Sequence, residues 1–467
     1  MTTATPGLGL KNGRAEGRKA NGIWSTSPRS GRFVAAMDAS ASPKLERERH
    51  LLFLEMMALG LPKEYESQEI NRLTLAYFAI SGLSILDALD RNGRAEGRKA
   101  NGIWSTSPRS GRFVAAMDAS ASPKLERERH LLFLEMMALG LPKEYESQEI
   151  NRLTLAYFAI SGLSILDALD RVDKDQVANW VLSFQAHSRM VADLDNGEFY
   201  GFCGSRTSQF STSICEVSRQ NCSHLASTYC ALAILKMIGY NLSNISPESI
   251  LISMRNLQQP DGSFMPIHFG AETDLRFVYC AAAICSMLNN WTGMDKEKAK
   301  DYIVKCQSYD GGFGLVPGSE SHGGATYCGV AALQLMGFIG ADICSKQAQS
   351  AVIDMPLLVE WSLKRQSFDG GIQGRCNKPS DTCYAFWVGG VLKMLGVYEF
   401  IDKDALRDFI LSCQSKYGGF TKFPENMLPD LYHSYYSFAA LSLLGEPGLR
   451  PLCVELGITA SDDGHGK

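Results

Sequence analysis

The sequence lacks a long apolar run, an excess of one charge and any paired cysteine spacing. No stretch approaches the roughly 18 apolar residues of a membrane span, and the N-terminus lacks the apolar core of a secretion signal. The 46 Lys and Arg residues are balanced by 50 Asp and Glu residues, which argues against a general nucleic-acid binder. All 13 cysteines lie singly between Cys203 and Cys453, as is typical of a reducing compartment. We therefore expect a cytoplasmic protein with no nucleic acid partner and no membrane span.

An identical tandem duplication occupies the N-terminal third, where residues 12–91 recur without a change as residues 92–171. Copies of an old structural repeat would have drifted, so this identity indicates a very recent duplication or an error in the assembled gene. Each copy opens with an Arg-, Gly- and Ser-rich stretch, and only the second copy runs directly into the rest of the chain. We expect residues 1–123 to be surplus and largely disordered or loosely packed. Residues 124–455 should form the folded domain, and residues 456–467 a flexible tail.

A drifted repeat in the body of the chain indicates the architecture. Four segments begin with Gln, followed by Gly and usually an aromatic residue, at Gln259, Gln307, Gln366 and Gln414, with spacings of 48, 59 and 48 residues. An amphipathic stretch precedes each segment and an apolar stretch follows it, which predicts an outer helix, a loop and a buried inner helix. Stacked pairs of this period predict an all-α fold, either a closed α/α barrel or an open protein-binding α-solenoid. In the barrel, inner-helix aromatics would line a funnel, namely Tyr327, Tyr384, Trp387 and Tyr435.

Three residues suit a catalytic metal. Asp381 follows a Pro and a Ser and opens an apolar helix, and Cys383 comes two residues later. Two such residues share a ligand only at a helix start, where His433 from a later loop would be a third donor. Three protein ligands leave one position open, as in catalytic zinc sites. The alternative from the residues alone is an N-cap Asp, a buried Cys and an unrelated His.

Four cationic or ionisable residues follow the Gln segments and should surround one mouth of the barrel. They are His322, Arg375, Lys378 and Lys422. A cluster of this kind suits a diphosphate, which needs fixed positive charge around its oxygens. Solvated loop charges are the alternative for any one of them.

Several motifs together resemble the β subunits of the protein prenyltransferases, from about Leu125 to Gly445. The matching segments are Asp381-Thr-Cys-Tyr-Ala-Phe-Trp387, Glu320-Ser-His-Gly-Gly324, Asp274-Leu-Arg-Phe-Val-Tyr-Cys280 and Asn289-Asn-Trp-Thr-Gly-Met-Asp295. The resemblance implies an α/α barrel with Zn²⁺ on Asp381, Cys383 and His433. It implies a diphosphate site at His322, Arg375, Lys378, Tyr384 and Lys422, of which Tyr384 and Lys422 act in catalysis, and a peptide site near Arg276.

Two positions narrow the resemblance to the type I geranylgeranyltransferases. Thr154 stands where farnesyltransferases have a Trp that blocks the isoprenoid pocket, and the resemblance implies that Phe158, one turn further along the same stretch, lines that pocket with it. Lys422 stands where magnesium-using members have an Asp, although the loop from Lys422 to His433 is one residue longer than in the animal form. The resemblance implies an obligate prenyltransferase α subunit, geranylgeranyl diphosphate, C-terminal Cys-a-a-X substrates (CaaX) such as small GTPases, and no need for magnesium. A farnesyltransferase β subunit is the nearest alternative, and a non-catalytic α/α solenoid is the alternative from another class.

Overall fold

The computed structural model describes residues 123–139, 151–186, 200–205, 223–268, 272–340, 352–424 and 428–459. All of them lie within one compact unit, Arg49–Lys467. The prediction that residues 1–123 are loosely packed falls outside the described residues, except for Pro123.

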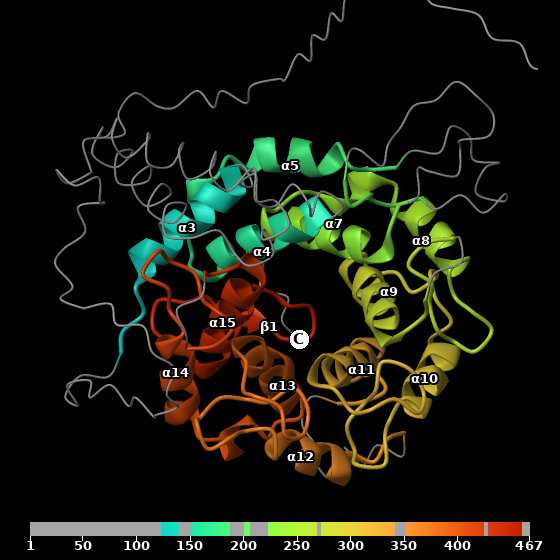
Figure 1. The fold of residues 1–467 in the computed structure, drawn as a ribbon. Coiled ribbons are helices and arrows are strands. Elements are labelled where there is room, and N and C mark those ends of the chain that lie inside the picture. Colours follow the sequence, from blue (N-terminus) through green and yellow to red (C-terminus); the bar gives the residue numbers. More distant parts are fainter. Residues whose placement is uncertain are drawn as a thin grey trace, which may run out of the picture. The chain divides into compact units, whose positions relative to one another are not determined.

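Helices of the described chain form two concentric rings, as the repeat predicts (Figure 1). Each inner helix contacts the next one, and α15 contacts α4, so the inner ring closes. The inner helices are α4 (Arg152–Ile165), α7 (Leu225–Met237), α9 (Leu275–Met287), α11 (Gly323–Met336), α13 (Thr382–Met394) and α15 (Leu431–Leu444). The outer helices are α3 (Arg127–Leu139), α5 (Lys174–Leu182), α8 (Pro247–Arg255), α10 (Lys296–Lys305), α12 (Met355–Leu363) and α14 (Lys403–Ser412). The prediction of a closed α/α barrel is therefore confirmed.

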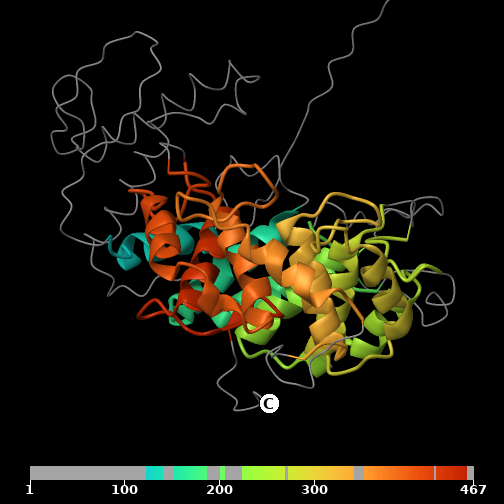
Figure 2. The same ribbon diagram turned by 90° about the horizontal axis from the view of Figure 1, so that it is seen from below.

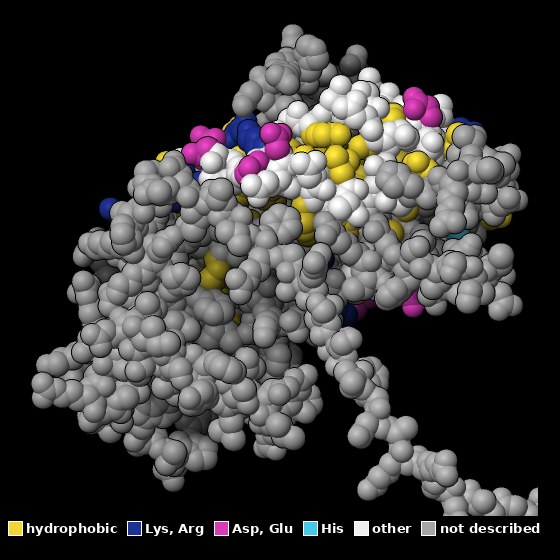
Figure 3. All heavy atoms as spheres, turned by 90° about the horizontal axis from the view of Figure 1, so that it is seen from above, with side chains coloured by type: hydrophobic (Ala, Val, Ile, Leu, Met, Phe, Trp, Pro, Cys, Tyr) yellow, Lys and Arg dark blue, Asp and Glu magenta, His cyan; other side chains and the backbone are white. Residues whose placement is uncertain are grey.

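Viewed from below, the described helices form a single band (Figure 2). The inner helices are apolar on nearly every side, because they pack against two neighbours and an outer helix. Short 3-10 turns, η3 (Leu169–Arg171), η6 (Leu242–Ile245) and η7 (Tyr398–Phe400), lie in the connections that lead to outer helices. None of the helices in the described residues has the length and apolar character that a membrane crossing requires. On the side that carries α5, the described surface mixes hydrophobic, acidic and basic side chains (Figure 3).

Glutamine side chains join consecutive outer helices. Gln366 donates to the carbonyl of Asp402 and accepts from its N–H, at 2.8 and 2.9 Å, and Asp402 caps α14. Gln307 binds Asp354 in the same way. We call each such pair of hydrogen bonds a glutamine clasp.

The first clasp corrects the sequence reading of the repeat. Gln258, rather than the predicted Gln259, binds Asp295. A further unit begins at Gln185, whose amide donates to the carbonyl of Ile245. Its bridge partner is Phe202, whereas in the other units the partner lies six residues after the Gln, as Phe264 does after Gln258. The greater number of residues between Gln185 and Phe202 hid the unit from the sequence pattern.

The last clasp closes the ring through the second copy of the duplication. Gln414 donates to the carbonyl of Lys124 and accepts from the N–H of Glu126, at 3.0 and 2.9 Å. Gln414 Oε1 also lies 3.0 Å from Nε2 of the buried His130, whose Nδ1 accepts the N–H of Gly419 at 2.9 Å. These partners require the neutral imidazole with its proton on Nε2, and burial lowers the pKa of His130 to about 4.

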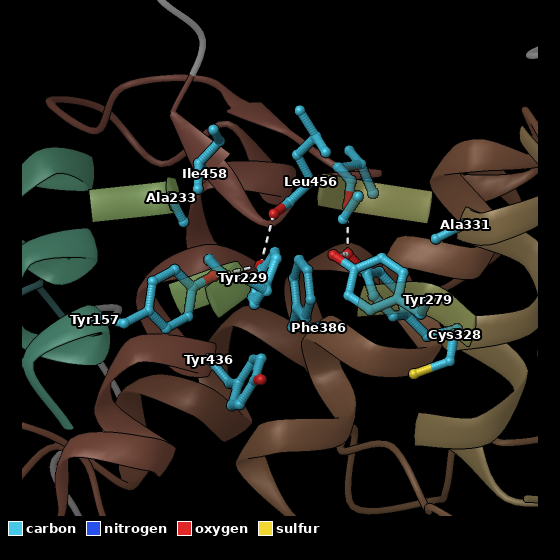
Figure 4. Packing of buried hydrophobic residues seen from close by; sticks show 14 of the residues in the cluster. Tyr157, Tyr229, Ala233, Tyr279, Cys328, Ala331, Phe386, Tyr436, Leu456 and Ile458 are labelled. Carbon is cyan, nitrogen blue, oxygen red and sulfur yellow. Dashed lines mark hydrogen bonds between the residues drawn. The ribbon is translucent and has the colours of Figure 1, made fainter. Parts of the chain in front are cut away.

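A layer of tyrosines fills the centre of the ring. Tyr229, Tyr279, Tyr327 and Tyr435 each lie five residues after the N-cap of an inner helix. Tyr157 on α4 joins them, because its hydroxyl oxygen lies 3.0 Å from that of Tyr229 and 2.8 Å from that of Tyr435. Figure 4 shows Tyr157, Tyr229 and Tyr279 directed from their helices toward the segment that contains Leu456.

The C-terminal segment ends in a small antiparallel hairpin of β1 (Leu452–Cys453) and β2 (Ile458–Thr459) that closes this layer. Tyr229 donates to the carbonyl of Leu456 at 2.8 Å, and Tyr327 donates to that of Val454 at 2.6 Å. Both Tyr157 and Tyr435 donate to the carbonyl of Gly457. The tyrosines thus supply donors for backbone carbonyls that are buried away from water.

Two expectations are corrected here. Leu456 and Ile458 are buried, so the fold continues to Thr459 rather than ending at residue 455. Tyr327 and Tyr435 are 1% exposed and bind the hairpin, so they form a floor instead of lining an open funnel. The remainder of the predicted tail, residues 460–467, lies outside the described residues.

Candidate metal and anion site

The predicted site residues gather because inner helices begin at one end of the ring. The N-caps of α9, α11, α13 and α15 are Asp274, His322, Asp381 and Asp430. Each side chain accepts a hydrogen bond from a backbone N–H in the first turn of its helix, as a capping residue does. Loops that follow the outer helices end at these caps, so a repeated fold places unlike side chains around one mouth.

Asp381, Cys383 and His433 meet at this mouth. One ligand atom from each lies within 4.8 Å of the others. Asp381 Oδ1 accepts the N–H of Cys383 at 3.0 Å and lies 3.4 Å from His433 Nε2. The capping bond holds Asp381 beside Cys383 at the first turn of α13, which is where two such residues can share a ligand.

The electrostatics of this group favour a bound cation. Burial raises the pKa of Asp381, but hydrogen bonds from His433 and the Cys383 backbone outweigh it and leave that pKa below its ordinary value. Burial lowers the pKa of His433, yet its bonds to Asp381 and Asp430 raise it to about 9. Burial, and then the charge of Asp381, raises the pKa of the Cys383 thiol well above its ordinary value. A proton on His433 therefore provides positive charge where a metal would lie.

Asp430 is a member of the site that the sequence reasoning missed. Its Oδ2 lies 2.6 Å from His433 Nδ1, and its Oδ1 accepts the His433 N–H at 2.8 Å. A carboxylate on Nδ1 fixes the ring so that Nε2 faces Asp381 and Cys383. The spacing of three residues between a capping Asp and a His is the signal that could have revealed it.

His322 and Tyr384 form the centre of the predicted anion site. His322 Nε2 lies 2.9 Å from the Tyr384 hydroxyl, and His322 Nδ1 accepts the N–H of Gly324. Burial lowers the pKa of His322, and burial raises that of Tyr384 to about 12, so both are neutral at pH 7 and offer hydrogen bonds. The Tyr384 ring packs on the backbone of Gly374, where a Cβ atom would lie 2.0 Å from the ring.

Three cations stand around these neutral donors. Arg375 follows Gly374 and pairs with Glu320 at 2.8 Å. Lys378 is exposed at the other end of the same turn. Lys422 lies 3.6 Å from Asp381 Oδ2, and its carbonyl accepts the N–H of Thr382 at 3.2 Å, so it is attached to the start of α13. The structure thus places Lys422 beside the predicted metal group.

The remaining predicted residues occupy different surroundings. Thr154 on α4 is partly buried, and its Oγ1 lies 3.8 Å from Cys230 Sγ. Phe158 is buried against Tyr432, Tyr435 and Tyr436. Arg276 forms a bidentate pair with the capping Asp274 and remains about half exposed. Arg276 therefore lies at a neighbouring cap of the mouth, in the first turn of α9.

Comparisons with known proteins agree with this architecture. The model of the prenyltransferase α/α toroid domain matches residues 45–121 and 125–458. The β subunit of geranylgeranyl transferase type 1 from Arabidopsis thaliana is 66% identical over 346 residues, covering 74% of this chain and 92% of that protein. The corresponding Dictyostelium discoideum subunit is 34% identical over 71% of this chain and 95% of its own length.

A solved structure supports the fold. Candida albicans protein geranylgeranyltransferase-I, determined with GGPP, superposes with a TM-score of 0.62 at 24% identity. The superposition covers 72% of this chain and 96% of the Candida chain. At this identity the likeness supports the ring of helices alone.

Proposed function

The chain belongs to the prenyltransferase α/α toroid family, and we propose that it is the catalytic β subunit of a type I protein geranylgeranyltransferase. The observation that carries the proposal is the convergence of Asp381, Cys383 and His433 beside the cation-lined His322–Tyr384 pair. A metal that binds a thiol and a site that binds a diphosphate are the two requirements of prenyl transfer to cysteine.

The donor set fits zinc. One carboxylate oxygen, one sulfur and one imidazole nitrogen are ligands that zinc accepts, and three protein ligands leave a fourth position for substrate. Asp430 orients His433, as carboxylates behind zinc-binding histidines do. When bound, zinc supplies a Lewis acid that lowers the pKa of the substrate's cysteine thiol and keeps it as thiolate.

The chain's own residues then act on the diphosphate. The substrate sulfur attacks the first carbon of the prenyl group, the carbon–oxygen bond breaks, and the diphosphate leaves. His322 and Tyr384 donate hydrogen bonds to its oxygens, while Arg375, Lys378 and Lys422 stabilise the growing negative charge. Lys422 lies beside the metal group, 3.6 Å from Asp381, and we propose that its ammonium takes the place of a magnesium ion on the leaving diphosphate. We therefore propose magnesium-independent transfer.

The lipid specificity is assigned to α4. Thr154 is small and partly buried, which leaves room for a longer isoprenoid than a Trp would, and Phe158 lies one turn further on the same helix. Burial of each additional CH₂ group contributes about 0.8 kcal/mol, so a fourth isoprene unit binds more tightly if the space exists. Arg276 is proposed to contact the bound CaaX peptide.

The partners and location complete the proposal. A prenyltransferase α subunit is the expected obligate partner, and CaaX proteins such as small GTPases are the expected substrates. A cytoplasmic location suits the unpaired cysteines of the described residues.

The test is transfer to a CaaX peptide by the purified heterodimer in the presence of a magnesium chelator. We expect activity with geranylgeranyl diphosphate to persist, and farnesyl diphosphate to be the poorer donor. Preference for farnesyl diphosphate together with loss of activity on chelation would indicate a farnesyltransferase instead. A heterodimer without metal and without transfer activity would indicate a non-catalytic α/α solenoid.

A further inference from the structure

A partly exposed tyrosine lies directly beside the metal group. Tyr432 precedes His433 in the first turn of α15 and is 36% exposed, whereas Tyr435 and Tyr436 on the same helix are buried. Its ring packs edge-on against His433, with ring centres 5.0 Å apart, and against Phe158 of α4, at 5.7 Å. Tyr432 is therefore held in a defined position although part of it faces solvent.

A hydrogen bond from Trp387 fixes the direction of the Tyr432 hydroxyl. Trp387 Nε1 on α13 donates to the hydroxyl oxygen at 3.0 Å. An indole nitrogen can only donate, so the tyrosine oxygen is the acceptor in this pair and keeps its own proton for another partner. Burial, followed by the charge of Cys383, raises the pKa of Tyr432, so the proton stays on the hydroxyl at pH 7.

The sulfur of Cys383 is the acceptor available to this proton. Cys383 lies four residues before Trp387 on α13, so one face of that helix presents both groups to Tyr432. Burial and Asp381 raise the pKa of the Cys383 thiol, and a hydrogen bond from Tyr432 lowers it by more than the charge of Lys422 does. Donation therefore runs from Trp387 to Tyr432 and from Tyr432 to Cys383.

We propose that Tyr432 is a positioning residue that directs the sulfur of Cys383 toward the metal by donating a hydrogen bond to it. The inference rests on the proposed function, because it requires the zinc site. Each of the other two ligands already has such a partner: Asp430 orients His433, and the N–H of Cys383 holds Asp381. Tyr432 completes the set, since hydrogen bonds behind metal ligands fix their direction and tune how strongly they donate to the metal.

Tyr432→Phe tests the inference, because it removes the hydroxyl and keeps the ring that packs against His433 and Phe158. Zinc affinity of the heterodimer is measured by competition with a chelator, and we expect about a tenfold loss. In the cobalt-substituted heterodimer, the thiolate-to-cobalt absorption band should move to longer wavelength, because a sulfur without its hydrogen bond gives up electron density more readily. Tyr436→Phe is the matched control: its ring lies 4.7 Å from that of Tyr432 on the next turn of α15, and loss of its hydroxyl should change neither quantity.

A second variant tests the part played by Trp387, in the absence of prenyl diphosphate so that lipid contacts do not enter. Trp387→Phe leaves the Tyr432 hydroxyl without its donor, so zinc affinity should fall by a smaller factor and the cobalt band should shift in the same direction. Added to Tyr432→Phe, the same substitution should have no further effect on zinc affinity, because no hydroxyl is left to hold.

Two results would contradict the account at different levels. A cobalt band at the wild-type wavelength in Tyr432→Phe would overturn the positioning role and leave the proposed function intact. A wild-type heterodimer that binds neither zinc nor cobalt would refute the proposed function, and the positioning role with it.

Discussion

Replacement of His130 by Phe tests which copy of the duplicated segment closes the ring. His50 occupies the same position in the first copy, within an identical stretch of sequence, so His50→Phe is a matched control. The aromatic ring of Phe would keep the stacking on Phe420, whose ring centre lies 4.7 Å from that of His130. The substitution therefore removes the hydrogen bonds and little else.

The magnitude follows from the lost partners. The N–H of Gly419 would be left buried without an acceptor, and Gln414 Oε1 would keep only the N–H of Glu126. An unsatisfied buried group costs about 1–3 kcal/mol and a lost hydrogen bond about 1 kcal/mol, so we expect His130→Phe to cost about 3 kcal/mol. We expect His50→Phe to change stability by less than about 0.5 kcal/mol.

Chain entropy explains why the second copy, rather than the first, should dock and close the ring. If the first copy occupied the groove, the second copy of 80 residues would form a closed loop before Val172. Closing such a loop costs roughly 4 kcal/mol, whereas a free N-terminal extension costs nothing of this kind. Equal contacts from identical sequences cannot offset that difference.

The pH dependence of stability provides a second readout for the same variant. The unfolded chain protonates His130 near its ordinary pKa of 6.5, whereas the folded chain resists protonation until about pH 4. The contribution is therefore complete above pH 6.5 and is lost as the pH falls from 6.5 to 4, by up to about 3 kcal/mol. His130→Phe should lack this dependence.

Urea unfolding midpoints of the two heterodimer variants, measured at pH 7.5 and pH 5, give the stability change of each variant and its pH dependence under matched conditions. Equal midpoints for His130→Phe and His50→Phe, or a larger loss for His50→Phe, would refute the assignment of the docked copy.

Three further predictions concern the site and the floor of the ring. Thr154→Trp should shift the donor preference toward farnesyl diphosphate, while the matched control Thr74→Trp in the first copy should not. The same donor preference for both variants in competition assays would count against the pocket assignment. Asp430→Ala should weaken zinc affinity about 10–100-fold by releasing His433, as measured by competition with a chelator, and unchanged affinity would exclude the orienting role. Tyr229→Phe should lower stability by about 1–3 kcal/mol because the carbonyl of Leu456 loses its donor, and an unchanged melting temperature would show that this bond contributes little.

The ring and the metal group were predictable because their signals are local or repeated. The amphipathic outer and apolar inner stretches recur with a fixed order, so the stacked helix pairs followed from the sequence, while the choice of a closed barrel over an open solenoid came from the family resemblance. Asp381 has the flanking Pro and Ser of an N-cap, and the Cys two residues later suits a helix start. The likeness to prenyltransferase β subunits then joined His433 to them across about 50 residues.

The floor of the ring was not predictable because its contacts join distant segments. Tyr157 and Gly457 are separated by 300 residues, and each tyrosine on its own is typical of an ordinary buried aromatic. The short C-terminal segment has too little apolar periodicity to suggest that it is buried. Asp430 was overlooked because its action passes through His433 rather than through the metal.

The central claim is a zinc-dependent transfer site built from Asp381, Cys383 and His433, and metal content measured together with transfer activity tests it most directly. We predict about one zinc per purified heterodimer, geranylgeranyl transfer to a CaaX peptide, and loss of both in His433→Ala with an unchanged circular dichroism spectrum. Full transfer activity in a heterodimer that contains no bound metal would contradict the account.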